Sequence, residues 1–196
     1  MKSRRKRGSG LSIGPEGIAA AAAQIRSPNC DERPLGTIVS LVVIHGISLP
    51  PLRFRGDGVA RLFTNTLDAN GHPYFARIVE LRVSAHFFIR RDGRLIQFVS
   101  CAQRAWHAGQ SSWQGRERCN DFSIGVELEG ADDVPYASAQ YVVLGRLVRA
   151  IRRRYPILAV VGHGDIAPGR KTDPGPAFDW PRLRRRLATP GVRGRT

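Results

Sequence analysis

Hydrophobic residues occur in short blocks along the chain, and the spacing within each block indicates the element that it forms. Residues 41–44 read Leu-Val-Val-Ile, and an uninterrupted apolar run of this length is typical of a strand buried on both faces. Residues 85–90 and 94–99 flank the pair Asp92-Gly93, which favours a type I′ turn, so they predict a β-hairpin. Residues 122–128 alternate between apolar and polar and predict a further strand, and residues 158–161 predict a short one.

Helical periodicity is clearest in residues 138–155, where apolar side chains recur at positions 141, 144, 147, 148 and 151. Arginines occupy the other face of this helix, and we interpret them as a solvated surface: Arg146, Arg149, Arg152 and Arg153. Shorter helices are predicted at residues 16–25, which are rich in alanine, at 59–67 and at 180–187. The pattern predicts an α/β (α+β mixed) single domain whose central mixed β-sheet is flanked by helices.

The ends of the chain differ in composition from its middle. Residues 1–15 are basic, contain glycine and serine and lack apolar periodicity, so we expect a disordered N-terminal tail. Residues 189–196 contain Pro190, Gly191 and Gly194, and we expect a flexible basic C-terminal tail. The folded domain is therefore expected to span residues 16–188, a length that can bury a core of its own.

The formal net charge of +15 is concentrated at these ends. Residues 2–7 and 182–195 hold eleven of the 31 lysines and arginines and no acid, which leaves a net charge of only +4 between them. Charge of this kind attracts nucleic acid or anionic lipid, but it equally keeps a protein in solution. We interpret the ends as solvated and expect no specific nucleic-acid partner.

Cysteine usage and hydropathy bear on the compartment. The three cysteines, Cys30, Cys101 and Cys119, form neither a disulfide framework nor a CxxC pair, which favours reduced thiols in a cytosol. No stretch approaches the roughly 20 apolar residues of a membrane span, and the apolar run at 18–23 is too short for an export signal. We therefore expect a cytoplasmic protein without a membrane partner.

Two histidines occupy positions that favour a functional site. His45 directly follows the apolar run 41–44, and His163 follows the run that ends at residue 161, so both are expected at a sheet rim where clefts form. Asp173 lies ten residues further on, in a loop stiffened by two prolines. Two imidazoles and one carboxylate leave the fourth position of a tetrahedral zinc site open, as catalytic zinc requires. Asp165 is the alternative third ligand, although a local turn hydrogen bond explains it better.

Five segments then carry a specific resemblance, in this order along the chain: residues 41–51 (LVVIHGISLPP), 82–93 (RVSAHFFIRRDG), 104–109 (RAWHAG), 115–130 (GRERCNDFSIGVELEG) and 162–180 (GHGDIAPGRKTDPGPAFDW). Together they resemble the type 2 N-acetylmuramoyl-L-alanine amidases, and among them the cytosolic 1,6-anhydro-N-acetylmuramyl-L-alanine amidases. This family is related in fold to the peptidoglycan recognition proteins. The resemblance covers residues 16 to 187.

The resemblance implies roles for particular residues. It implies a Zn²⁺ site formed by His45, His163 and Asp173. It implies Glu127 as the general base and Lys171 as a group that stabilises the oxyanion, while Arg82 and Arg118 match positions that hold substrate. Glu129 is the alternative base, because residues 127 and 129 of a strand face the same side. A surface ion pair remains an equal interpretation of Arg82.

The implied activity is zinc-dependent hydrolysis of the amide bond between (1,6-anhydro)-N-acetylmuramic acid and L-alanine, for recycling of peptidoglycan. The expected partner is an anhydromuropeptide substrate, and the expected state is a monomer. Two alternatives stay open: an exported amidase acting on polymeric peptidoglycan, and a muropeptide-binding protein without activity. One departure concerns the residue after the first ligand, where the cytosolic enzymes usually have asparagine and this chain has Gly46.

Overall fold

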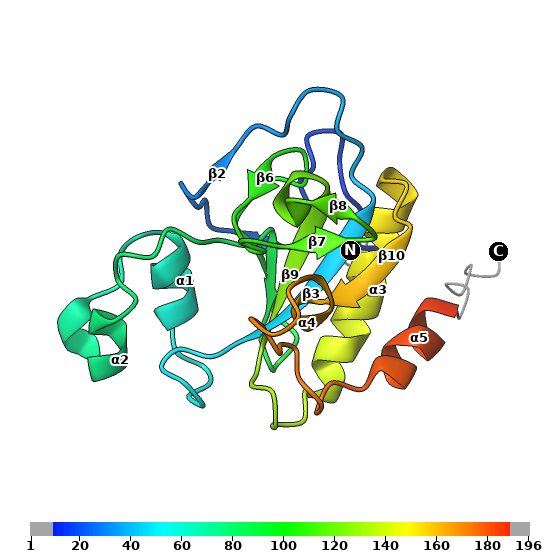
Figure 1. Cartoon of the computed structure of the whole chain (residues 1–196). Helices are drawn as coiled ribbons and strands as arrows, with labels where there is room; N and C mark the ends of the chain where they lie inside the picture. The colour runs from blue at the N-terminus through cyan, green and yellow to red at the C-terminus, as the bar shows by residue number, and fades with distance from the viewer. Residues whose placement is uncertain (1–9, 189–196) are drawn as a thin grey trace, which may run out of the picture.

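A six-stranded sheet forms the centre of the computed structural model, which describes residues 10–188 (Figure 1). The strand order is β1-β5-β4-β9-β3-β10. The strands are β1 (Ala23–Gln24), β3 (Leu41–Ile47), β4 (Phe87–Ile89), β5 (Leu95–Gln97), β9 (Ser123–Glu129) and β10 (Ala159–Gly162). Every pair is parallel except β4 with β5, so the sheet is mixed, as the sequence predicted.

In the two longest strands, β3 and β9, successive side chains point to alternate faces of the sheet. Val42 and Ile44 of β3 belong to the same apolar cluster as the helical residues Leu144 and Leu147. Val43 belongs to another cluster, on the opposite face. The odd-numbered residues of both strands, which include His45 and Glu127, therefore face away from the long helix.

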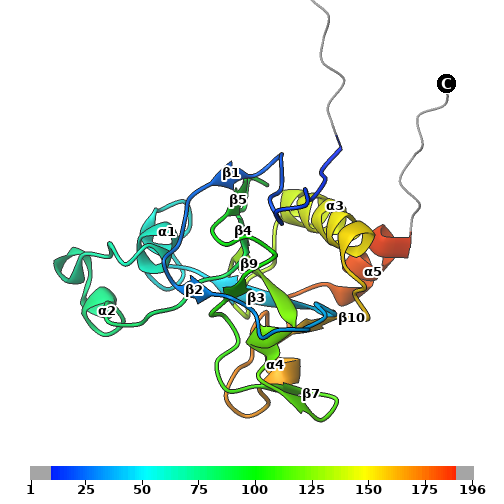
Figure 2. The ribbon, with the colours of Figure 1, turned by 90° about the horizontal axis from the view of Figure 1, so that it is seen from above.

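One face of the sheet is covered by α3 (Ser138–Arg154) and α5 (Trp180–Ala188), as Figure 2 shows. The predicted periodicity of α3 is confirmed, because Tyr141, Leu144, Leu147, Val148 and Ile151 are all buried. Arg146, Arg152 and Arg153 are exposed, as a solvated helix surface requires. Arg149 is half-buried and donates a hydrogen bond to the carbonyl of Arg186, so it connects α3 to α5 instead.

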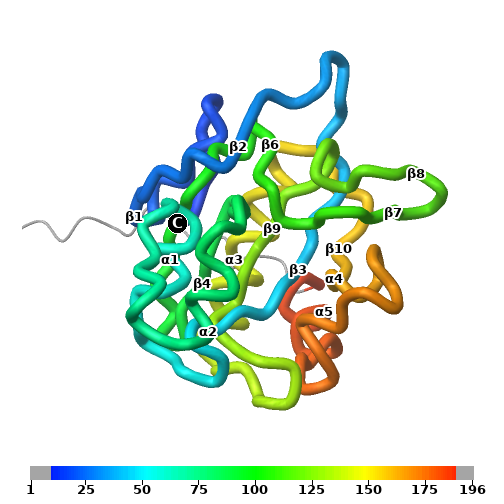
Figure 3. The backbone as a smooth tube through the Cα atoms, turned by 60° about the vertical axis from the view of Figure 1, so that its left-hand side comes forward, coloured from blue at the N-terminus to red at the C-terminus, as the bar shows by residue number. Residues whose placement is uncertain are grey.

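The other face carries shorter elements. In Figure 3, α1 (Gly58–Phe63) and α2 (Pro73–Ala76) lie to the left of β3, and α4 (His163–Ile166) lies to its right. The remaining short elements are β2 (Cys30–Asp31), η1 (Ala69–Gly71), β6 (Arg104–Ala105), β7 (Ser112–Trp113), β8 (Arg116–Glu117) and η2 (Cys119–Asp121). Most of this face is thus built from loops and single turns, which leaves room for a cavity over β3 and β9.

The predicted hairpin is present as β4 and β5, but its turn is not type I′. That turn needs positive φ at both central residues, and of the pair Asp92-Gly93 only Gly93 has it, at +86°. Arg90 and Arg94 are joined by a backbone hydrogen bond of 2.9 Å, and the Gly93 N–H donates to the Arg90 carbonyl at 2.8 Å. The connection therefore has three residues, with glycine in the left-handed position.

The predicted helix at residues 16–25 is wrong. Ala23–Gln24 pairs with β5 instead, and the Ala19 N–H donates to the side chain of Gln97 at 2.8 Å. Gly17 has a φ of +76°, which a right-handed helix does not allow. Alanine has a high intrinsic helix propensity, but burial of Ala19 and an open sheet edge outweigh it here.

Residues 10–15, which were predicted as part of the N-terminal tail, are described by the structure. Leu11 and Ile13 pack against the main core cluster, and Ile13 forms a bridge with Ala19. Residues 1–9 and 189–196, where the tails were predicted, lie outside the described residues. All three cysteines are free thiols. Between residues 10 and 188, no helix is both long and apolar enough to cross a bilayer.

Candidate metal and active site

Three separate elements deliver the candidate metal ligands. His45 is the fifth residue of β3, inside the strand and not after its end as predicted from sequence, because β3 continues to Ile47. His163 is the first residue of α4, and the preceding Gly162 is paired with Ile44 of β3. This pairing places the two histidines side by side at the carboxyl end of neighbouring parallel strands. Asp173 comes from the loop that follows α4.

The three side chains converge on one point. The Nδ1 atoms of His45 and His163 lie 3.0 Å apart, and Oδ2 of Asp173 lies 3.2 Å from each of them. In a tetrahedral zinc site with bonds of about 2.0–2.1 Å, neighbouring ligand atoms are separated by about 3.3–3.4 Å. The observed separations are close to these values, and the donor set of two nitrogens and one oxygen suits Zn²⁺.

Electrostatics also favours a cation at this point. Burial lowers the pKa of His45 to about 4, despite the contact with Asp173, so its imidazole is neutral at neutral pH. Burial alone would raise the pKa of Asp173, but its contacts with the imidazoles of His163 and His45 outweigh burial and hold that pKa well below its usual range. The cluster therefore presents lone pairs and one negative charge, which is the state in which such residues bind a metal.

Glu127 stands next to this cluster. It is the register partner of His45 on the neighbouring strand β9, and only 8 % of its surface is exposed. Its Oε2 is buried and has no hydrogen-bond partner among the described residues. Burial, and then the negative charge of Asp173, raise the pKa of Glu127 well above its usual value, while Lys171 opposes the shift. A buried carboxyl group with an unused oxygen is suited to accept a proton from a ligand.

The alternative residues are engaged in local structure. Glu129 forms an ion pair with Arg90 at 3.3 Å, and its carboxylate also accepts the backbone N–H groups of Arg55 and Arg91. Asp165 accepts the N–H of Gly162 at 2.7 Å and so caps the start of α4. These contacts leave Glu127 and Asp173 as the better candidates for base and third ligand.

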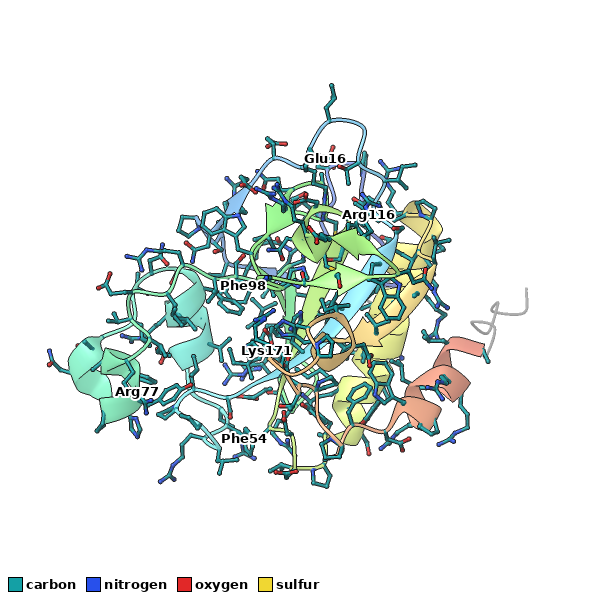
Figure 4. The ribbon with its side chains drawn as sticks, viewed as in Figure 1. Glu16, Phe54, Arg77, Phe98, Arg116 and Lys171 are labelled. Atoms are coloured by element: carbon teal, nitrogen blue, oxygen red, sulfur yellow. The ribbon has the colours of Figure 1, made fainter. Side chains whose placement is uncertain are left out.

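Lys171 is exposed and lines the same cavity as the cluster. Figure 4 shows it near the middle of the view, whereas Arg77 lies at the far left and Arg116 lies above it. The positive charge of Lys171 lowers the pKa of Glu127, against the effects of burial and of Asp173. A cation that lines this cavity is suited to stabilise an oxyanion that forms beside the cluster.

The cavity has a volume of about 560 Å³, which is large enough for a small glycopeptide fragment. The cluster and Glu127 are part of its lining. Tyr74 and Trp106 line it with aromatic surface, and Asp132 and Asp133 line it with negative charge. The lining therefore combines apolar and charged surface.

The two arginines predicted to hold substrate do not line this cavity. Arg82 pairs with Glu80 at 3.7 Å and donates to the Val79 carbonyl at 3.1 Å. Arg118 has a left-handed backbone with φ +60°, pairs with Asp121 at 3.2 Å, and lines a second cavity of about 370 Å³. The side chain of Arg82 is 48 % exposed and that of Arg118 is 70 % exposed, so both remain accessible.

Gly46 and Tyr136 form a contact that sequence reasoning missed. A Cβ atom at position 46 would lie 2.2 Å from the hydroxyl oxygen of Tyr136, so a larger residue there requires Tyr136 to move. The same hydroxyl donates a hydrogen bond of 3.0 Å to the carbonyl of Pro174, next to Asp173. Tyr136 therefore fills the space that a side chain at position 46 would need. Its hydrogen bond also connects it to the loop that carries Asp173. Nothing in the residue spacing signals this contact, because it depends on tertiary packing.

Comparison with known proteins now defines the class. The sequence pattern of the N-acetylmuramoyl-L-alanine amidase family (Amidase_2) matches residues 35–176, so the chain belongs to this family. It is 56% identical over 177 residues to the 1,6-anhydro-N-acetylmuramyl-L-alanine amidase AmpD of Citrobacter freundii, covering 89% of this chain and 94% of that relative.

Solved structures agree with this assignment. The crystal structure of a selenomethionine AmpD derivative superposes with a TM-score of 0.86 and 56% identity, covering 88% of this chain and 97% of that one. The Escherichia coli amidase AmiD, in complex with anhydro-N-acetylmuramic acid-L-Ala-D-gamma-Glu-L-Lys, gives a TM-score of 0.54 at 31% identity, covering 90% of this chain and 65% of that one. The family resemblance and the fold class expected from the sequence are therefore confirmed.

Proposed function

We propose that this protein hydrolyses the amide bond between (1,6-anhydro)-N-acetylmuramic acid and L-alanine, with Zn²⁺ as cofactor, in the recycling of peptidoglycan fragments. One observation carries the proposal: three ligand atoms converge within 3.0–3.2 Å of one another beside the unpartnered carboxylate of Glu127. The names of the AmpD relatives and the muropeptide bound to AmiD support the same substrate class.

The proposed ligands are His45, His163 and Asp173. When bound, Zn²⁺ would supply Lewis-acid chemistry that draws electron density from the amide carbonyl and makes a water molecule easier to deprotonate. His45 comes from strand β3, His163 from the start of α4 directly after β10, and Asp173 from the loop that follows α4. The two imidazoles are therefore placed by regular elements, while the loop supplies the negative charge. Three protein ligands leave one position for the substrate side, as catalytic zinc sites do.

Glu127 is the proposed proton carrier. Its raised pKa makes it a stronger base when ionised and a usable acid when protonated. It takes the proton of the attacking water and then delivers it to the nitrogen of L-alanine as the carbon–nitrogen bond breaks. Without that proton the amine would have to leave as an unstable anion, so this transfer is needed for cleavage.

Lys171 is the proposed partner of the oxyanion. When water attacks, the carbonyl oxygen gains a negative charge, and an ammonium group stabilises it more than it stabilises the neutral amide. We propose Arg82 and Arg118 as groups that hold the substrate outside the main cavity, where their exposed guanidinium groups can meet carboxylates of a stem peptide.

Two other functions are less well supported. A muropeptide-binding protein without activity has no need for an unpartnered buried carboxylate, which costs stability. An exported amidase would have the same site, and we favour the cytoplasm because two free cysteines are fully buried and none is paired. We further propose a monomer without a specific nucleic-acid partner. Removal of residues 1–9 and 189–196 should lower affinity for DNA, most visibly at low salt, and leave hydrolysis unchanged.

The test combines metal analysis with product analysis. Purified protein should contain about one zinc per chain and should release free tripeptide and the anhydromuramic sugar from anhydromuramyl-tripeptide. A chelator should stop the reaction, and added Zn²⁺ should restore it. Glu127→Gln should keep zinc and lose activity by about 10²–10⁴-fold. Full activity of the metal-free protein, or of Glu127→Gln with its zinc in place, contradicts the proposal.

A further inference from the structure

Each histidine of the candidate metal cluster forms a contact through Nε2, the ring nitrogen that faces away from the metal position. The two residues that they contact, His107 and Ala108, are consecutive in the chain. Nε2 of His45 lies 2.9 Å from Nδ1 of His107. Nε2 of His163 lies 3.2 Å from the carbonyl oxygen of Ala108. The segment 107–108 therefore contacts both imidazoles on the side that faces away from the metal position.

The direction of the hydrogen bonds follows from the number of protons available. The hydroxyl of Ser123 donates its single hydrogen to the carbonyl of Cys119 at 2.5 Å, so its oxygen can only accept from Nε2 of His107, at 3.2 Å. Nδ1 of His107 then carries a lone pair and accepts from Nε2 of His45. This leaves Nδ1 of His45 without a proton and pointing at the metal position.

The tautomer of His163 follows from a single contact. A carbonyl oxygen can only accept, so Nε2 of His163 must carry the hydrogen that it donates to Ala108. Its Nδ1 is then free to bind the metal. Both imidazoles are thus fixed in the tautomer that a metal site through Nδ1 requires, and their ring planes are fixed with it.

The 107–108 segment is itself held from the neighbouring segment 119–123. Oδ1 of Asn120 accepts the backbone N–H of His107 at 3.1 Å and that of Ala108 at 2.8 Å. Gly125 leaves the space for the imidazole of His107, since a Cβ atom there would lie 2.5 Å from its ring. The side-chain amide of Asn120 and the hydroxyl of Ser123 therefore set the positions of His107 and Ala108.

We propose that Asn120 and Ser123 are positioning residues for the zinc site, acting through His107 and Ala108 on the two histidine ligands. The inference rests on the proposed zinc site. Neither residue lines the main cavity, and Ser123 is fully buried, so neither is placed to contact substrate there. Their effect is transmitted through hydrogen bonds alone, and it should appear in metal affinity before it appears in substrate binding.

The test measures zinc affinity by competition with a chromophoric chelator, on the full chain. Asn120→Ala and Ser123→Ala should each weaken zinc binding by about 10–100-fold, the usual effect of losing a group that orients a ligand. Asn120→Asp retains an oxygen that can accept both N–H groups and should stay near wild type. Ser27→Ala is the matched control, because Ser27 is buried and its hydroxyl also joins two backbone groups, at Phe63 and Asn29.

Substitution by cobalt gives a second readout, because the visible spectrum of Co²⁺ reports the arrangement of its ligands. The spectrum should change in Asn120→Ala and Ser123→Ala but not in Asn120→Asp or Ser27→Ala. If Ser123→Ala fails to fold, the comparison of Asn120→Ala with Asn120→Asp decides. Equal zinc affinity in Asn120→Ala, Asn120→Asp and Ser27→Ala overturns the inference while the proposed function stands. A wild-type protein that binds no zinc overturns both.

Discussion

His45 and Glu127 are register partners on the adjacent parallel strands β3 and β9. Neighbouring strands lie about 4.7–4.9 Å apart, and side chains of paired residues in a parallel sheet project from the same face. The spacing of the proposed ligand and the proposed base is therefore set by the pairing of the two longest strands of the sheet. Asp173 and Lys171, by contrast, lie two residues apart on a loop, and their placement depends on contacts such as the one from Tyr136 to Pro174.

The buried carboxyl group of Glu127 should make stability depend on pH. Its pKa is raised in the folded protein, so the folded state holds a proton that the unfolded state releases above about pH 4.5. As pH rises through and beyond this range, the buried charge increasingly opposes folding. Glu127→Gln removes the charge, so the metal-free variant should match wild type at acidic pH and unfold at a higher temperature at neutral and alkaline pH.

Thermal unfolding of the two metal-free proteins at about pH 4 and about pH 8 checks this expectation. The comparison isolates Glu127 because all other titrating groups are common to both proteins. A variant that is no more stable than wild type at the higher pH would mean that the carboxylate has a partner in solution.

Lys171 should matter for the rate of the reaction more than for zinc binding. Lys171→Met keeps much of the length of the side chain and removes the charge, and kcat should fall by about 10²–10³-fold, as for loss of an oxyanion partner. Zinc content should be unchanged, because Lys171 is not among the three converging side chains. Lys171→Arg keeps a cation and should retain more activity than Lys171→Met. Equal losses in the two variants would argue against an electrostatic role.

The contact between Gly46 and Tyr136 can be tested with a double-mutant cycle. Gly46→Ala places a methyl group 2.2 Å from the Tyr136 hydroxyl, and such overpacking should cost about 1–3 kcal/mol in the free energy of unfolding. Tyr136→Phe removes the clashing oxygen, and the nearest ring carbon would then lie 3.5 Å from the new methyl group, an ordinary contact distance. Gly46→Ala should therefore cost much less in the Tyr136→Phe background, as measured by chemical denaturation.

Arg82 and Arg118 should affect substrate binding and not the chemical step. Arg82→Ala and Arg118→Ala should each raise KM while kcat and zinc content stay the same, as expected for uniform binding. Arg146→Ala is the control, since Arg146 is exposed on α3 and belongs to the opposite layer. Steady-state kinetics on anhydromuramyl-tripeptide gives the comparison. An unchanged KM for Arg82→Ala would favour the surface ion pair with Glu80 as its only role.

Local sequence features predicted the parts of the molecule that depend on local physics. The apolar runs at 41–44 and 122–128 identified the two central strands, and the 3.6-residue period identified α3. The run 41–44 pointed to His45 and the run 158–161 pointed to His163, although β3 continues past His45 to Ile47. These features need only neighbours in sequence to be recognised.

The features that sequence analysis missed depend on residues that are far apart in the chain. The alanine-rich segment 16–25 is not helical because Gln97, more than 70 residues later, binds Ala19 and β5 pairs with β1. Tyr136 lies 90 residues from Gly46. The preference for Asp173 over Asp165 likewise depends on which carboxylate turns towards His45, and spacing alone does not contain that information.

The six-stranded sheet separates the solvent-facing surface of α3 from the cavity over β3 and β9. Substitutions on the arginine-bearing side of α3 are screened from the reaction groove by a full layer of buried side chains, so they can accumulate without altering turnover. No such layer of buried side chains separates the loops over β3 and β9 from the groove, so substitutions in these loops can affect it directly. Relatives of this chain should therefore diverge freely in the charge of α3, and an engineer can attach a tag or a solid support there while preserving the reaction.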